Sequence, residues 1–577
     1  MADLKNLLVK SIAKQLKIDP AKVRSLIEVP PSKEFGDYSL PCFVIAKDFG
    51  KKPTELAAEL VKELSLPRGF SKAEAVGPYV NFYMDSKYVN SIVLSRVLKE
   101  GARYGRNNIG KKKRVMIEYS QPNTNKPMHI GHLRNDSIGL SISRIFEFCG
   151  YKVIKANLFN DRGIHICQAM LAYKLWGNNE TPKKAKMKGD KFVGKYYVMF
   201  HQKAKEDPKL NEMAREMLKK WESKDKETLA LWKKMRSWVI SGFKETYKKF
   251  GSEFDVCFFE SNFYDKVGDI VKEGLEKGVF FKDKGGAVIA RLAPLPDKVI
   301  LREDGTSIYI SNDLVLTKYK IEHYKLDLNI FVVASEQKEY FKQLFRIFEL
   351  LGYKWYKINE HLCYGLVLLP EGKLKSREGK VIDADDFIDE LKELAKKELL
   401  KRHEKLSQKE VEKRALAIAI AAIKFYMLKI EPIKDILFEP EKSISFEGGT
   451  GPYIQYTYAR AKSILRKALD KKPKSKKFNI GKKTNFTLLS DECEKDLIKK
   501  LFEFESTVKK SLEERKPNMI CNYLLELCEC FNSFYHKLPV LDAEKELKEA
   551  RLALVKAVCI VISNGMYLLG IPILEEM

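Results

Sequence analysis

The chain has 577 residues, of which 45% are apolar, which is ordinary for a globular protein of several domains. Its 105 basic and 78 acidic residues give a net charge of +27, a surplus that favours a phosphate-bearing partner such as a nucleic acid. The ten cysteines include no C-x-x-C pair, which argues against a zinc site and against a disulfide framework. Lysine or asparagine interrupts the longest apolar stretches, so we expect no membrane span.

The first part of the chain mixes short helices with strands. Residues 1–16 predict an amphipathic helix that contains Asp3 and no arginine, unlike a transit peptide, and we therefore expect a cytoplasmic protein. The aromatic run "YVNFYM" at 79–84 predicts a strand. A basic linker, "GKKKR" at 110–114, closes a first domain that we place at residues 1–110.

A strand, a polar loop and a helix follow the linker. The run at 115–120 predicts a buried strand, the helix spans about His129 to Cys149, and 152–159 predicts a second strand. This order begins a parallel α/β nucleotide-binding unit, so we predict a Rossmann-type catalytic domain over residues 111–380.

Two later regions have different patterns. A lysine-rich region at about 170–255, with four tryptophans, predicts a helical insertion in that domain. From about residue 383 to the end, helical periodicity dominates, interrupted by a basic low-complexity stretch that we expect to be an exposed loop. Strand-like runs return between these two regions, at 287–292, 308–311, 329–335 and 362–369. The basic low-complexity stretch covers residues 471–483.

The loop before the first long helix carries the strongest chemical signal, "NTNKPMHIGHLRN" at 123–135. His129 and His132 lie on one face of the first helical turn, where they can donate hydrogen bonds to phosphate oxygens at the positive end of the helix. Gly131 permits close approach, and Lys126 adds a positive charge. Such a site suits phosphoryl chemistry in which the protein positions and neutralises. In isolation the pair could equally be a surface accident, and metal ligation is disfavoured because no third ligand is visible.

Seven stretches occur in an order that resembles one family across nearly the whole chain. "MHIGH" contains the HIGH signature of class I aminoacyl-tRNA synthetases, and the segment from Glu118 to Asn135 has the form found in the arginyl-tRNA synthetases of that class. The other stretches are "FGDYSLP" and "GPYVNF", then "NDRGIHI" and "SIYISND", and finally "GTGPYIQYTYAR" and "LLGIPILEEM". The HIGH signature alone is shared with other class I synthetases and, more loosely, with nucleotidylyl transferases.

The resemblance implies a class I synthetase fold and a ligase activity. It implies an α/β N-terminal additional domain that contacts tRNA, the Rossmann-type catalytic domain, a helical stem-contact region at 381–448 and an all-α anticodon-binding domain at 449–577. The chain would activate L-arginine with ATP to arginyl-adenylate and transfer the arginyl group to the terminal adenosine of tRNA(Arg). Mg²⁺ would accompany the nucleotide, no zinc is expected, and we expect a monomer that does not bind membranes.

The resemblance also implies roles for particular residues. A guanidinium substrate needs carboxylates, which Glu118 and Asp313 can supply. His165 is as compatible with a structural role near the adenosine as with a direct contact. The implied catalytic residues are His129, His132 and Lys126; those for ATP are His129, Gly131, His132, Lys373 and Ser376; those for arginine are Glu118, Asn123, Tyr309, Asp313 and Gln337; and those for tRNA are Asn81, Tyr456 and Tyr535.

One stretch departs from the class pattern. The second signature of the class, KMSKS, corresponds to "KLKSREGK" at 373–380, where Ser376 replaces the second lysine. Many arginyl enzymes have a similarly degenerate loop and carry a lysine just upstream of HIGH, the place of Lys126. Lys375 and Arg377 compete for the role, and Lys126 could instead cap the loop or contact tRNA.

Two other functions stay open at this point. One is another class I synthetase or a nucleotidylyl transferase, which the "GDYSLP" domain and the absence of zinc spacing disfavour. The other is a non-catalytic RNA-binding paralogue, which would have no use for an intact HIGH signature and pocket.

Overall fold

The computed structural model describes residues 4–368, 370, 382–402, 406–470 and 484–577. Their contacts divide the chain into two compact units. The first unit comprises residues 1–104, 461–503 and 527–561, and the second comprises 105–460, 504–526 and 562–577.

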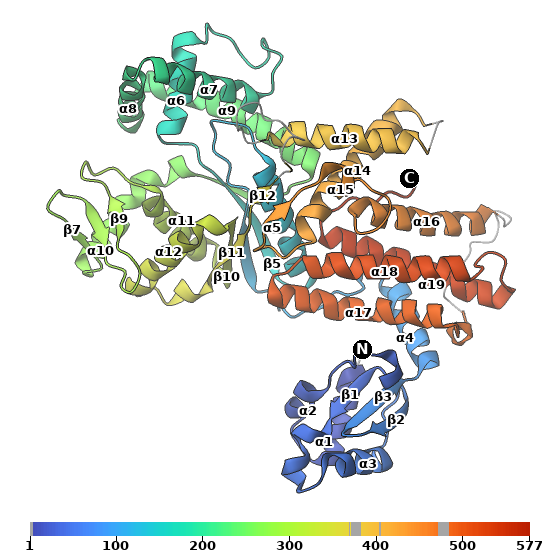
Figure 1. Ribbon diagram of the computed structural model, residues 1–577. Helices are drawn as coiled ribbons and strands as arrows, with labels where there is room; N and C mark the ends of the chain where they lie inside the picture. The colour runs from blue at the N-terminus through green and yellow to red at the C-terminus, as the bar shows by residue number, and fades with distance from the viewer. Residues whose placement is uncertain (1–3, 369, 371–381, 403–405, 471–483) are drawn as a thin grey trace. The chain divides into compact units, whose positions relative to one another are not determined.

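An antiparallel sheet organises the N-terminal part of the first unit, with the strand order β1-β3-β2 (Figure 1). The strand predicted at 79–84 is confirmed as the central β3, whose Val80 and Phe82 are fully buried, and α3 packs against it. The elements are α1 (Leu4–Leu16), α2 (Pro20–Leu26), β1 (Tyr38–Pro41), α3 (Pro53–Glu63), β2 (Phe70–Val76), β3 (Tyr79–Met84) and α4 (Ser86–Glu100).

A five-stranded parallel sheet with the order β11-β10-β4-β5-β6 forms the centre of the second unit. The strands predicted at 115–120, 152–159 and 329–335 are confirmed as β4, β5 and β10. Consecutive residues of β4, such as Val115 and Met116, are fully buried, as expected where helices cover both faces of a parallel sheet. The strands are β4 (Arg114–Glu118), β5 (Lys152–Phe159), β6 (Val256–Phe259), β10 (Leu328–Ala334) and β11 (Asn359–Tyr364).

The insertion between β5 and β6 is helical, as predicted from its lysine-rich, tryptophan-containing sequence (Figure 1). Trp221 and Trp232 are buried in edge-to-face contact, with ring centroids 5.3 Å apart, which explains the spacing of the aromatic residues. The helices of this region are α6 (Ile164–Trp176), α7 (Gly189–Glu206), α8 (Lys209–Glu222) and α9 (Lys226–Phe250), and α5 (Ile130–Phe148) precedes them.

The strand-like run predicted at 308–311 is wrong, because a helix begins there. The Ser311 hydroxyl accepts the Ile308 N–H at 3.1 Å and donates to the Ile300 carbonyl at 2.6 Å, which caps α11 (Tyr309–Tyr324). Ile310 and Leu314 are buried at helical spacing. The neighbouring elements are α10 (Val267–Glu276), β7 (Phe280–Lys282), β8 (Val288–Ala290), β9 (Lys298–Leu301) and α12 (Lys338–Leu350).

The C-terminal region is helical, as its periodicity predicted. Among the described residues, α19 alone is long and apolar enough to cross a membrane, but 78% of its most apolar window is buried, as in a core helix. The predicted loop at 471–483 lies outside the described residues. The elements are β12 (Val367–Leu368), α13 (Ala384–Leu400), α14 (Gln408–Leu428), β13 (Ile436–Leu437), α15 (Pro440–Ser443), α16 (Gly451–Asp470), α17 (Glu492–Glu514), α18 (Asn518–Lys537) and α19 (Lys545–Leu568).

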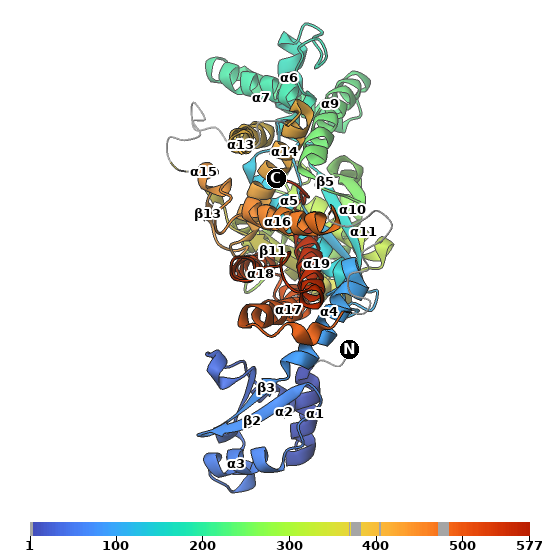
Figure 2. The same cartoon turned by 90° about the vertical axis from the view of Figure 1, so that its right-hand side faces the viewer.

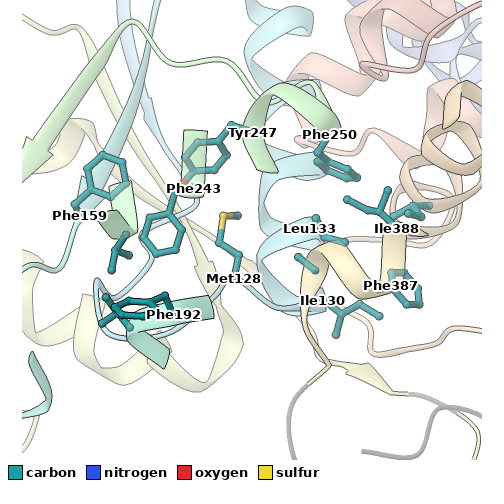
Figure 3. Close-up of a cluster of buried hydrophobic side chains, with 14 of the residues drawn as sticks. Met128, Ile130, Leu133, Phe159, Phe192, Phe243, Tyr247, Phe250, Phe387 and Ile388 are labelled. Atoms are coloured by element: carbon teal, nitrogen blue, oxygen red, sulfur yellow. The ribbon is translucent and has the colours of Figure 1, made fainter. Parts of the chain in front are cut away.

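A buried apolar cluster in the second unit fixes the start of α5 (Figure 3). Met128, Ile130 and Leu133 flank the two histidines in sequence and pack into this cluster. The inserted helices and α13 contribute other residues of the cluster, and this close packing holds the histidine turn in place. The other cluster residues labelled in Figure 3 are Phe159, Phe192, Phe243, Tyr247, Phe250, Phe387 and Ile388.

Candidate functional site

The two signature histidines cap each other at the start of α5. His129 is the N-cap residue, and its Nδ1 accepts the Gly131 N–H at 3.2 Å. The His132 Nδ1 accepts the His129 N–H at 3.0 Å, so the pair forms a reciprocal capping box. Gly131 has no Cβ, and one built there would lie 3.0 Å from the His129 ring, so glycine leaves room for that ring to fold back.

These bonds define the protonation of both rings. Burial lowers the pKa of His129 to about 4, and burial holds the pKa of His132 well below its usual value; the charge of Lys126 lowers both further. Both imidazoles are therefore neutral near pH 7. Since each Nδ1 accepts a backbone N–H, each proton resides on Nε2. The turn thus presents two Nε2–H donors.

The backbone of the same turn contributes less to an anion site than the sequence suggested. The Ile130 N–H donates to the Ile382 carbonyl, the Gly131 N–H to the His129 ring and the His132 N–H to the His129 carbonyl. The donors for an incoming phosphate are therefore the imidazoles and the nearby Lys126 ammonium. Among the described residues, no carboxylate forms an ion pair with the half-buried Lys126.

The turn lies at the place where a parallel sheet binds ligands. The sheet order runs from β4 through β5 to β6 on one side and through β10 to β11 on the other, so β4 borders the switch point. The loop after β4 is joined to the loop after β5, because the Thr124 N–H donates to the Asn160 carbonyl at 3.0 Å and the Asn160 N–H to the Pro122 carbonyl at 3.2 Å. Asn123 is exposed at this edge.

Glu118, a predicted arginine ligand, is already paired. Its Oε2 contacts the ammonium of the buried Lys320, and its Oε1 accepts the Gln121 Nε2–H at 3.1 Å. Glu118 and Lys320 are both nearly inaccessible, so their ion pair lies in the protein interior. The small exposed fraction of Glu118, 3%, disfavours direct binding of arginine by this residue.

Asp313 and a residue that sequence reasoning missed, Glu260, offer the more available carboxylates. Asp313 is half-buried and accepts the Tyr340 hydroxyl, and burial raises the pKa of Asp313 to about 6. Glu260 accepts the Asn312 amide at 2.9 Å, whereas its buried Oε2 has no hydrogen-bond partner among the described residues. Burial raises the pKa of Glu260 to about 7, and the charge of Asp313 contributes to this rise. Glu260 belongs to no motif in the sequence; only its place directly after the strand β6 could have suggested it.

The remaining predicted pocket residues are open to solvent. Tyr309 at the start of α11 is 61% exposed, and Gln337 before α12 is exposed. His165 is exposed in the first turn of α6, with its ring edge-to-face to Tyr197. Lys373 and Ser376 lie outside the described residues.

The predicted tRNA-binding residues differ in accessibility. Asn81 is 2% exposed and accepts the Ser39 hydroxyl at 2.7 Å, which ties β3 to β1 and does not favour direct contact with RNA. Tyr535 is 39% exposed, as a base-stacking role requires. Tyr456 is half-buried beneath Arg460, whose guanidinium lies 4.9 Å from the ring centroid.

Comparisons with known proteins agree with this geometry. Residues 93–439 match the family described as tRNA synthetases class I (R), catalytic domain; residues 454–577 match the DALR anticodon binding domain; and residues 2–84 match the arginyl tRNA synthetase N terminal domain. The chain is 43% identical to an arginine–tRNA ligase of Treponema denticola over 100% of both chains, and 40% identical to that of Borrelia hermsii over 100% of this chain and 99% of the relative. The arginyl-tRNA synthetase of Thermus thermophilus has a TM-score of 0.82 at 27% identity, covering 100% of both chains.

The fold, the histidine turn and the catalytic-domain match, which covers more than half of the chain, define a class I aminoacyl-tRNA synthetase. The matches to the relatives extend through the N-terminal and C-terminal domains as well. Within that class, the chain belongs to the arginyl-tRNA synthetase family.

Proposed function

We propose that this chain activates L-arginine with ATP and transfers the arginyl group to tRNA(Arg). The observation that carries the proposal is the pair of neutral imidazoles, each with its proton on Nε2, beside Lys126 at the carboxyl edge of β4. A purely RNA-binding protein has no need for such a site, and full-length matches to arginine–tRNA ligases support the amino acid.

In the first step, an arginine carboxylate oxygen attacks the α-phosphorus of ATP and pyrophosphate leaves. His129 and His132 donate hydrogen bonds to phosphate oxygens, and Lys126 balances the negative charge that develops there. Mg²⁺ enters with the nucleotide as part of the substrate. Because the histidines are neutral, they act as hydrogen-bond donors and do not exchange protons with the reacting groups.

In the second step, the 2′-hydroxyl oxygen of the terminal adenosine attacks the carbonyl carbon of arginyl-adenylate. AMP leaves, and the hydroxyl proton is lost to solvent or to the departing phosphate. Tyr535 stacks on an unpaired tRNA base, with Tyr456 and Arg460 as a further aromatic and cationic contact. The net charge of +27 attracts the phosphate backbone of the tRNA.

The substrate guanidinium binds between carboxylates. Asp313 supplies one charge, and Glu260 turns its unpartnered Oε2 toward the cation. Glu118 and Lys320 form a neutral wall behind them, which leaves Asp313 and Glu260 to select the cation. Tyr309, Asn123 and Gln337 close over the polar parts of arginine. The chain acts in the cytoplasm as a monomer.

Amino-acid-dependent pyrophosphate exchange, measured in the presence of tRNA with all standard amino acids, tests the proposal. Arginine alone should support exchange. Exchange with another amino acid would contradict the assigned pocket, and binding of tRNA without any exchange would support a non-catalytic paralogue instead.

A further inference from the structure

Arg134 is a large, charged side chain of α5 that is completely buried. It follows His132 by two residues on α5, and its exposed fraction is 0%. Its guanidinium has no carboxylate partner among the described residues and donates to four backbone carbonyls. These carbonyls belong to Gly365 at 2.7 Å, Leu366 at 2.9 Å, Pro432 at 3.0 Å and Lys434 at 2.6 Å.

The four carbonyls belong to two segments that lie against each other. Residues 365–366 lead into β12, which lies beside α5 (Figure 1). Residues 432–434 lead into β13, which pairs with β12 and is labelled in Figure 2. The Gly365 N–H donates to the Pro432 carbonyl at 2.9 Å, and the Leu366 N–H donates to the Asp435 carboxylate at 2.6 Å. A Cβ at Gly365 would lie 2.5 Å from Asp435 Oδ1, so the segments are as close as backbones allow.

The histidine turn is also attached to the chain beyond β12. The Ile130 N–H donates to the Ile382 carbonyl at 3.2 Å, and the Ala384 N–H donates to the Met128 carbonyl at 2.9 Å. Ile382 and Ala384 are therefore hydrogen-bonded to the two residues that flank His129.

Burial of the Arg134 guanidinium costs free energy of desolvation, which a purely structural contact between apolar side chains would avoid. A buried guanidinium without a counter-charge loses its hydration, and burial lowers the pKa of Arg134 to about 10. Apolar side chains could hold two loops against a helix at lower cost. A planar fork of donors instead sets the direction and distance of each carbonyl it binds.

We propose that Arg134 is a positioning residue for adenylate formation: it holds residues 365–366 and 432–434 at a fixed place relative to His129 and His132. The proposal rests on the proposed function. Arg134 touches neither substrate. It acts by holding the residues that follow β11, at the ligand-binding edge of the sheet, against the helix that begins with the histidine turn.

Arg134→Lys tests the proposal, because lysine keeps the charge but cannot bind four carbonyls. Arg144→Lys is the matched control: Arg144 lies on the same helix and donates to the Tyr567 carbonyl at 2.8 Å, away from the histidine turn. Pyrophosphate exchange with tRNA present reports adenylation, and single-turnover transfer from preformed arginyl-adenylate reports the second step. Thermal unfolding monitors stability in each variant.

Arg134→Lys should lower the kcat of exchange by roughly 10–100-fold, as expected for a small misplacement of reacting groups. The KM for arginine and the rate of transfer should change by less than about three-fold, and Arg144→Lys should leave both steps intact. Equal losses in both steps, or exchange unchanged in Arg134→Lys, would overturn the proposal. Wild-type protein without any exchange would overturn the proposed function itself.

Asp435→Ala provides a second test if Arg134→Lys does not fold. Asp435 is exposed, and its removal frees the Leu366 N–H from the same pair of segments without emptying a buried site. It should lower the kcat of exchange several-fold while transfer is kept. Exchange and transfer that both match wild type in Asp435→Ala would show that the position of these segments does not control adenylation.

Discussion

Asp313→Asn removes one negative charge from the proposed arginine site and keeps the size of the side chain. Asp313 is half-buried on α11, its carboxylate accepts the Tyr340 hydroxyl, and the nearby Glu118 charge is already matched by Lys320. Loss of one partner of a desolvated charge pair costs about 2–5 kcal/mol of binding. At about 1.4 kcal/mol per tenfold change, the dissociation constant for arginine should rise between about 30-fold and several thousand-fold.

Equilibrium binding of arginine and of ATP, measured separately on the variant, is the assay. ATP affinity should stay within about two-fold of wild type, because the histidine turn is untouched. Glu322→Gln is the control: it neutralises an exposed carboxylate on the same helix and should leave both affinities unchanged. Unaltered arginine affinity in Asp313→Asn would refute the placement of the guanidinium beside this carboxylate.

Three further outcomes follow from the site. Lys126→Ala should slow adenylation by roughly 10²–10³-fold, because one preorganised charge-stabilising group is lost. Lys375→Ala should slow adenylation less. A larger effect of Lys375→Ala would assign the role to the second signature stretch. Tyr535→Ala should weaken tRNA binding and spare arginine and ATP affinity, and equal charging at limiting tRNA would reject the stacking role. Arginine affinity should fall as the pH is lowered through 7 and 6, because the guanidinium needs both Glu260 and Asp313 ionised. The pKa of Glu260 is about 7 and that of Asp313 about 6. Arginine affinity that stays constant from pH 8 to 5.5 would contradict this expectation.

The sequence predicted the main elements of the catalytic unit because their signals are local. The run "VMIEYS" at 115–120 predicted β4, and the histidine turn marked the start of α5 through residues three apart. The run at 308–311 was misassigned to a strand, since four apolar and polar residues alone cannot distinguish the first turn of a helix from a strand. The cap by Ser311 that decides it requires the Ile300 carbonyl of another segment.

Features that depend on contacts between residues far apart in the chain could not be predicted from the sequence. Arg134 binds carbonyls more than two hundred positions away, the buried Lys320 pairs with Glu118 of another element, and Glu260 has no motif around it. Asn81 shows the converse case: its motif matched a family position, but the alternation of β3 could not reveal that its amide is buried against Ser39. Site roles inferred from motif position alone stay predictions.

Charging of total tRNA with labelled arginine by the wild type and by His132→Ala tests the central claim most directly. The wild type should charge a fraction of the tRNA to a plateau with arginine and with no other amino acid. His132→Ala should charge at least about 10²-fold more slowly with tRNA binding unchanged, because it loses one Nε2–H donor to the phosphate. Equal charging rates in both proteins, or a plateau reached with a different amino acid, would contradict the account.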